Sequence, residues 1–184
     1  VLDYSYCGEF LGGTVETPYK NLGAKNTVST GYHVLKLIFT EFKDEITKTD
    51  VIVDVGCGKG RVINYLLVLG LENKIIGIEL NERVAEETRE RFKDNSNVHI
   101  ISGNILENIP EEGTIFYLYN PFNSVITEQF KKKLTKIGKK GEPITIIYHN
   151  CAYVELFLED KNWTVDFLDT PSSLKTSIIR RNVL

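Results

Sequence analysis

The chain has 184 residues, of which 42% are hydrophobic and 26% are charged, and its formal net charge is −3 at pH 7. These values predict one folded domain with a sizeable core and exclude a disordered chain. The slightly negative balance argues against a dedicated nucleic-acid binder, which needs a broad positive field. No apolar run is long enough to span a bilayer, so we expect no membrane partner.

The cysteines predict a reducing environment. Cys7, Cys57 and Cys151 have neither the spacing of metal ligands nor the even number of a disulfide set. The cytoplasm is therefore the expected location, and no spacing in the chain predicts a metal site. The chain contains no methionine, so an initiator residue is expected upstream of Val1.

Residues 1–30 are expected to form an irregular N-terminal arm, because they are rich in Gly, Thr, Tyr and Asn and show no sustained period. A helix is predicted over 31–46, where apolar residues recur at helical spacing after Thr30.

The stretch 51–61 predicts a strand, a tight turn and the start of a helix. Its first five residues are apolar except for Asp54, and glycines then occupy alternate positions from Gly56 to Gly60. A strand without alternation is typical of the buried centre of a parallel sheet. Glycines let the backbone turn sharply and leave no Cβ between the chain and a ligand at the carboxyl end of that strand.

The pattern D-x-G-x-G-x-G over 54–60 decides between two ligands. A dinucleotide fingerprint would require glycine where this chain has Arg61. The pattern instead resembles motif I of the class I S-adenosylmethionine-dependent methyltransferases. The resemblance implies S-adenosylmethionine as cofactor, with Asp54 ordering the turn or meeting the cofactor's amino group through a water. It also implies that the methionyl and ribose portions lie against Gly56, Cys57, Gly58 and Gly60.

A second buried strand, 74–80, ends in a carboxylate at the distance where a ribose ligand is expected. A carboxylate can accept from both hydroxyls of a ribose diol. Glu79 is therefore the predicted ribose ligand, with Leu80 beside it at the cofactor. The alternative is that Glu79 caps the helix predicted over 81–93.

A third strand, 97–102, is followed by Gly103 and Asn104. In the family resembled, the corresponding turn carries an acidic residue or an amide that meets the exocyclic amine of the adenine. The resemblance thus implies that Asn104 binds the cofactor. A plain turn explains the Gly-Asn pair nearly as well.

The sequence Asn120-Pro121-Phe122-Asn123 follows a fourth strand, 114–119. It resembles motif IV, (D/N/S)-P-P-(Y/F/W), of methyltransferases that act on nitrogen. The resemblance implies that Asn120 accepts from the target N–H beside the cofactor, that the Pro121 segment supplies a carbonyl and that Phe122 stacks on the acceptor. Such acceptors would orient the nitrogen lone pair and stabilise the developing charge. The second proline is missing, so Tyr119 could instead hold the polar position, or the segment could be a plain turn.

The remaining elements are a helix over 124–137, a strand over 144–148 that ends at His149, a helix over 152–158, and strands over 163–168 and 176–181 that suit an antiparallel hairpin. His149 is expected in the pocket wall rather than as a base. Tyr19, Thr30 and Tyr32 are candidates to line the site, although packing explains the tyrosines better. A lysine cluster could grip phosphate but suits a solvated helix end better: Lys131, Lys132, Lys133, Lys136, Lys139 and Lys140.

This element count matches the class I methyltransferase fold, a three-layer α/β sandwich with a mostly parallel sheet of order 3-2-1-4-5-7-6 and an antiparallel seventh strand. One methyltransferase domain is expected over 31–184. The implied function is methyl transfer to a nitrogen on a protein, a nucleic acid or a small molecule. No inserted target-recognition domain is apparent, which argues against sequence-specific DNA. The alternatives are a non-catalytic module that binds S-adenosylmethionine or S-adenosylhomocysteine, and an NAD-dependent oxidoreductase; the acceptor and the oligomeric state stay open.

Overall fold

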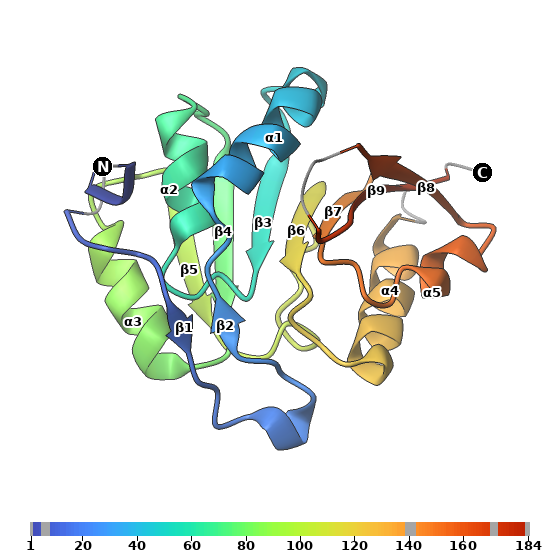
Figure 1. Ribbon diagram of the computed structural model, residues 1–184, viewed down its shortest axis with the longest axis horizontal. Helices are drawn as coiled ribbons and strands as arrows, with labels where there is room; N and C mark the ends of the chain where they lie inside the picture. Colours follow the sequence, from blue (N-terminus) through green and yellow to red (C-terminus); the bar gives the residue numbers. More distant parts are fainter. Residues whose placement is uncertain (1, 5–7, 139–142, 170–172, 183–184) are drawn as a thin grey trace.

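The computed structural model describes residues 2–4, 8–138, 143–169 and 173–182, so Cys7, Lys139 and Lys140 lie outside the described residues. A seven-stranded sheet forms its centre (Figure 1). The strands are β3 (Val51–Val55), β4 (Lys74–Glu79), β5 (Val98–Ser102), β6 (Ile115–Tyr119), β7 (Thr145–His149), β8 (Trp163–Leu168) and β9 (Thr176–Arg181).

The order across the sheet is β5-β4-β3-β6-β7-β9-β8. Strands β3 to β7 pair in parallel, whereas β9 runs antiparallel to both β7 and β8. Counted within this sheet alone, the order is 3-2-1-4-5-7-6. The labels are shifted by two because a separate two-stranded sheet precedes it, which the sequence did not predict. The fold is the expected three-layer, Rossmann-like sandwich.

Helices cover both faces of the sheet, which is why its central strands are apolar without alternation. One core cluster joins the sheet to α1 (Tyr32–Phe42), α2 (Arg61–Val68) and α3 (Glu82–Arg91). The other joins it to α4 (Ser124–Gly138) and α5 (Glu155–Leu158). Within β6, Ile115 and Tyr117 belong to the first cluster, and Phe116 and Leu118 belong to the second.

Three helices are shorter in the structure than predicted. The helix predicted over 81–93 spans Glu82–Arg91. The helix expected over 31–46 ends at Phe42, and a 3-10 turn, Lys43–Glu45, follows it. Such tightening is common at helix ends. The helix expected over 152–158 begins only at Glu155, after a turn in which the amide of Val154 donates to the carbonyl of Cys151. Among the described residues, no helix combines the length and apolar character needed to cross a membrane.

In the described residues of the arm, 2–4 and 8–30, the regular elements are short: two 3-10 turns (Leu2–Tyr4 and Lys20–Leu22) and the strands β1 (Thr14–Val15) and β2 (Thr27–Val28). Figure 1 shows β1 and β2 beyond the carboxyl ends of the parallel strands. At its start, the Asp3 carboxylate accepts from Arg61 Nε and Nη2 at 3.1 and 2.8 Å. At its end, the hydroxyls of Thr30 and Tyr117 lie 2.9 Å apart. The arm is thus fastened to α2 at its start and to β6 at its end.

Candidate functional site

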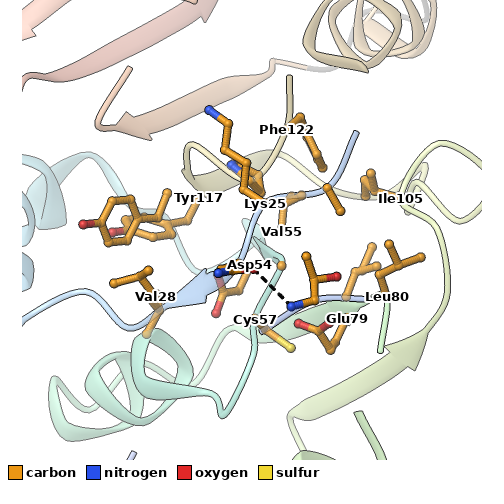
Figure 2. Close-up of a pocket in the computed structure, with 18 of the residues that line it drawn as sticks. Lys25, Val28, Asp54, Val55, Cys57, Glu79, Leu80, Ile105, Tyr117 and Phe122 are labelled. Carbon is orange, nitrogen blue, oxygen red and sulfur yellow. Dashed lines mark hydrogen bonds between the residues drawn. The ribbon is translucent and has the colours of Figure 1, made fainter. Parts of the chain in front are cut away.

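A hollow lies where β3, β4, β5 and β6 end, and the arm covers it. We call it the central hollow. Figure 2 shows Asp54, Cys57 and Glu79 grouped together in it, with Lys25 and Phe122 across from them. The sheet contributes Asp54, Val55, Gly56, Cys57, Glu79, Leu80, Gly103, Asn104, Ile105, Tyr117, Tyr119, Pro121 and Phe122, and the arm contributes Ala24, Lys25, Asn26, Val28 and Thr30 among others.

The glycine turn after β3 is held by its own backbone. The amides of Gly56 and Cys57 donate to the carbonyl of Ile78 on β4 at 2.8 and 3.0 Å. Gly60 has φ +81°, and a Cβ there would lie 2.4 Å from Cε2 of Phe92. Gly60 is therefore needed for close packing against the end of α3. Neither Gly58 nor Gly60 lines the central hollow, in contrast to Gly56 and Cys57.

Glu79 connects the hollow to this turn. Its buried carboxylate accepts from the amide of Gly58 at 3.0 Å through Oε2 and from the amide of Asn81 at 2.8 Å through Oε1. The cap of α3 is Asn81, whose Oδ1 accepts from the amide of Val84. A carboxylate has about four acceptor positions, so both oxygens of Glu79 can still accept from a ligand.

Asp54 is the unusual group of the hollow. Its side chain is buried, and Oδ2 has no hydrogen-bond partner among the described residues. Burial, and secondly the charge of Glu79, raise the pKa of Asp54 to about 8. Burial also raises the pKa of Glu79. Two carboxyl groups that are costly to ionise therefore face one hollow, and a ligand with a positive charge or hydrogen-bond donors would relieve that cost.

Asn104 lines the hollow, but its amide oxygen already accepts from the amide of Leu106 at 2.9 Å. This contact is the local turn that the sequence left open as an alternative. The burial of Cys57 raises the pKa of its thiol well above the usual value, so the thiol in the wall stays neutral.

The motif after β6 is divided between two places. Pro121 and Phe122 line the central hollow, and the Phe122 ring packs 5.8 Å from that of Phe130. Asn120 does not line it: its amide oxygen accepts from the Tyr148 hydroxyl at 3.3 Å. The carbonyl of Pro121 accepts from the amide of Lys25 at 3.0 Å.

The other predicted candidates also separate. Thr30 lines the central hollow, whereas Tyr19 and Tyr32 do not. The Tyr32 hydroxyl donates to Asp3 at 2.6 Å, and its ring lies beside Arg61. His149 is buried but does not line the central hollow, so its predicted place in the pocket wall is wrong; its ring lies 4.7 Å from that of Tyr119, which does line the hollow. Burial lowers the pKa of His149 to about 4, so its ring is neutral near pH 7.

Sequence reasoning missed the arm wall, which Ala24, Lys25, Asn26 and Val28 form. The wall is tied down by a bridge between Ala24 and Phe122 and by the Lys25 amide. No periodic pattern in the sequence indicates either of these two contacts.

Comparison with known proteins agrees with this geometry. Residues 52–139 match the family model described as a methyltransferase domain. A protein-lysine N-methyltransferase from Saccharolobus islandicus is 28% identical over 100 residues, which are 53% of this chain and 61% of that protein. Ribosomal RNA small subunit methyltransferase A from Dehalococcoides mccartyi is 30% identical over 104 residues, 56% of this chain and 34% of that protein. The matches thus span under two thirds of each of these two relatives.

Solved structures share the fold. An RNA methyltransferase from Salinibacter ruber, in complex with S-adenosyl-L-homocysteine, has a TM-score of 0.59 at 19% identity, covering 84% of this chain and 92% of that one. A putative methyltransferase from Escherichia coli has a TM-score of 0.63 at 13% identity, covering 94% of this chain and 100% of that one. The match over residues 52–139 thus identifies a methyltransferase domain, and the sheet order and the shared fold are those of class I S-adenosylmethionine-dependent methyltransferases.

Proposed function

We propose that the chain binds S-adenosylmethionine in the central hollow and transfers its methyl group to a nitrogen, in the cytoplasm. The observation that carries the proposal is the pair of buried carboxyl groups, Asp54 and Glu79, beside the glycine turn. The cofactor carries a ribose diol and an amino group, which can donate hydrogen bonds to carboxyl oxygens. Its sulfonium is a cation, which a carboxylate attracts.

Each side of the hollow has a proposed role. Glu79 holds the ribose hydroxyls with the lone pairs that Gly58 and Asn81 leave unused. The unpartnered Oδ2 of Asp54 accepts from the amino group, directly or through a water. Leu80 and Ile105 supply apolar contact for the adenine, with Asn104 at its edge. The cofactor supplies an activated methyl carbon, so the chain needs only to orient the acceptor and exclude water.

The nitrogen assignment rests on the segment after β6. The Phe122 ring lies at the hollow, and the Pro121 carbonyl retains one lone pair beyond the Lys25 contact. The amide oxygen of Asn120 is proposed to accept from the target N–H when this contact replaces its weak hydrogen bond from the Tyr148 hydroxyl. A protein-lysine N-methyltransferase among the relatives supports the same atom type.

Calorimetric titration with S-adenosylmethionine, S-adenosylhomocysteine and NAD tests the cofactor. We expect both sulfur compounds to bind and NAD not to bind. Glu79→Gln should weaken the sulfur compounds at least about tenfold, because a charge-assisted contact to the ribose is lost. Glu41→Gln, an isosteric change at an exposed glutamate on α1, should leave the affinity unchanged. Binding of NAD alone, or equal affinity in the two variants, would contradict the proposal.

A second candidate is a module that binds the cofactor without transferring a methyl group. The engaged acceptors favour it, since the Asn120 oxygen and the Pro121 carbonyl both have partners within the chain. Transfer of radiolabelled methyl from S-adenosylmethionine to pooled peptides, RNA and metabolites separates the two. A catalyst loses transfer in Asn120→Ala but retains cofactor affinity, and a binding module labels nothing in either form.

A further inference from the structure

A second hollow adjoins the central one on the other side of the arm wall. It shares five lining residues with the central hollow: Ala24, Lys25, Asn26, Val28 and Tyr119. Its remaining lining residues are Lys20, Asn120 and Asn150. A group bound there would therefore lie next to the central hollow, and its target nitrogen would have to reach past β2, its flanking residues and the Tyr119 ring to meet the methyl carbon.

The two hollows differ in their charged groups. The central hollow contains the carboxyl groups of Asp54 and Glu79 together with Lys25 and Arg61, whereas none of the described residues lining the second hollow carries a carboxylate. The charged residues that line the second hollow are both lysines. Lys20 is exposed and has no ion pair with another described residue, and the Lys25 ammonium lies 4.9 Å from the centroid of the Tyr153 ring. This local positive charge is notable in a chain with net charge −3.

Two asparagines at this hollow hold unusual backbone angles. Asn120 and Asn150 have φ values of +41° and +51°, and they are the only described non-glycine residues with positive φ. They follow β6 and β7 directly, where Tyr119 pairs with His149. Such left-handed residues are uncommon outside glycine and gather at functional sites. The side chain of Asn150 has no hydrogen bond to another described residue, so its amide can contact a ligand.

Building on the proposed methyl transfer, we propose that the second hollow is the acceptor site and that it takes a phosphate-bearing acceptor whose target is an uncharged base nitrogen. Lys20 and Lys25 hold the phosphate, and the amide groups of Asn120 and Asn150 contact the edge of the base. A lysine side chain is the opposite case: it arrives protonated, is repelled by both lysines and must lose a proton before it can react.

The transfer step balances without a further reactant. The nitrogen lone pair forms the new bond to the methyl carbon, and the carbon–sulfur bond breaks with its electrons remaining on sulfur, which gives S-adenosylhomocysteine. The nitrogen then loses its hydrogen to water as a proton. The amide oxygen of Asn120 accepts a hydrogen bond from that nitrogen while positive charge develops on it.

Titration of the protein saturated with S-adenosylhomocysteine tests this proposal, because saturation blocks the central hollow. The probes are AMP, a mixed-sequence RNA decamer with a 5′-phosphate, and a lysine-rich peptide of the same length. We expect AMP or the decamer to bind and the peptide not to bind. Lys20→Ala should weaken binding about fivefold, and the double variant Lys20→Ala, Lys25→Ala at least tenfold. If the decamer binds much more tightly than AMP and its affinity falls steeply with salt, the phosphate belongs to an RNA strand. If AMP and the decamer bind with equal affinity, the acceptor is a single nucleotide.

Two controls keep this result separate from the cofactor proposal. Lys48→Ala, an exposed lysine just before β3 at the opposite edge of the sheet, should change nothing. S-adenosylhomocysteine should bind Lys20→Ala as tightly as the wild type, because Lys20 does not line the central hollow. If it fails to bind the wild type, the cofactor proposal fails. If it binds but neither phosphate probe does, if the lysine variants keep full affinity, or if the peptide binds best, only the acceptor proposal is overturned.

Discussion

The turn after β3 and the turns after β6 and β7 solve the same problem in different ways. Each must reverse the chain at the carboxyl edge of the sheet with a residue in the left-handed region. The turn after β3 uses glycines and is held by β4 and α3. The other two use Asn120 and Asn150, and the segment after Asn120 is held by the arm through the Lys25 amide.

The difference separates two kinds of site. The glycine turn presents backbone to the central hollow and is fixed by β4 and α3, so its shape is preformed. The asparagine turns retain polar side chains at the second hollow, and part of their support comes from a segment outside the sheet. Rigidity is thus concentrated where the cofactor is proposed to bind, and side-chain chemistry where the acceptor is proposed to bind.

Breaking the glycine turn should have the largest effect. In Gly60→Ala the new Cβ would lie 2.4 Å from the buried Phe92 ring at a φ of +81°. Overpacking and backbone strain together should lower the free energy of unfolding by about 3 kcal/mol. Urea denaturation measures this loss. Gly70→Ala is the matched control, since Gly70 has φ +75° with nothing within 4 Å of a Cβ, and it should lose only about 1 kcal/mol. Equal losses would show that the contact with Phe92 is unimportant.

The buried carboxyl group of Asp54 in the central hollow predicts an effect of intermediate size on the affinity for the cofactor. Because burial raises the pKa of Asp54 to about 8, this carboxyl is mostly protonated in the free protein at pH 7. A cationic cofactor favours the ionised form, so binding should release a proton and tighten as pH rises from 6 to 8, by up to about tenfold per unit. Calorimetry in buffers of different ionisation enthalpy measures the released proton. The same pH slope in Asp54→Asn would rule out Asp54 as its source.

The same pKa shift fixes the sign of a stability effect. A carboxyl whose pKa is raised on folding destabilises the fold as it ionises, so this contribution is absent below the ordinary pKa of an aspartate and grows until pH passes about 8. Asp54→Asn should therefore be more stable relative to wild type at pH 9 than at pH 5.

Replacing an asparagine at the edge should have the smallest effect. Asn150→Gly retains easy access to a φ of +51° and should change the free energy of unfolding by less than about 0.5 kcal/mol. Asn150→Ala should lose about 1 kcal/mol, because alanine tolerates the left-handed region less well than asparagine. Thermal unfolding of both variants measures the difference. A larger loss in the glycine variant than in the alanine variant would mean that the side chain, and not the backbone angle, matters at this turn.

The sheet was predictable because burial on two faces imposes a pattern that residues must satisfy. The strands Trp163–Leu168 and Thr176–Arg181 have the bounds that their alternation predicted. The grouping of Asp54, Cys57 and Glu79 was predictable as well, because the carboxyl ends of neighbouring parallel strands meet at one edge of the sheet. Their roles toward the cofactor remain predictions.

The arm and the orientation of Asn120 were not predictable, because both depend on contacts between distant residues. Strands of two residues, such as Thr27–Val28, are too short for a period. The partner of the Lys25 amide is a carbonyl far along the chain, at Pro121. Whether the Asn120 oxygen faces the hollow or the Tyr148 hydroxyl depends on the neighbouring strand rather than on its own motif.

The attachments of the arm have a kinetic consequence. Asp3 is held by Arg61 and Tyr32, the Leu2 carbonyl accepts from Asn64, and the Lys25 amide donates to the Pro121 carbonyl. A ligand that enters past the arm must release some of these contacts first. We therefore expect the association rate of the cofactor to level off at high ligand concentration, at the rate at which these contacts open.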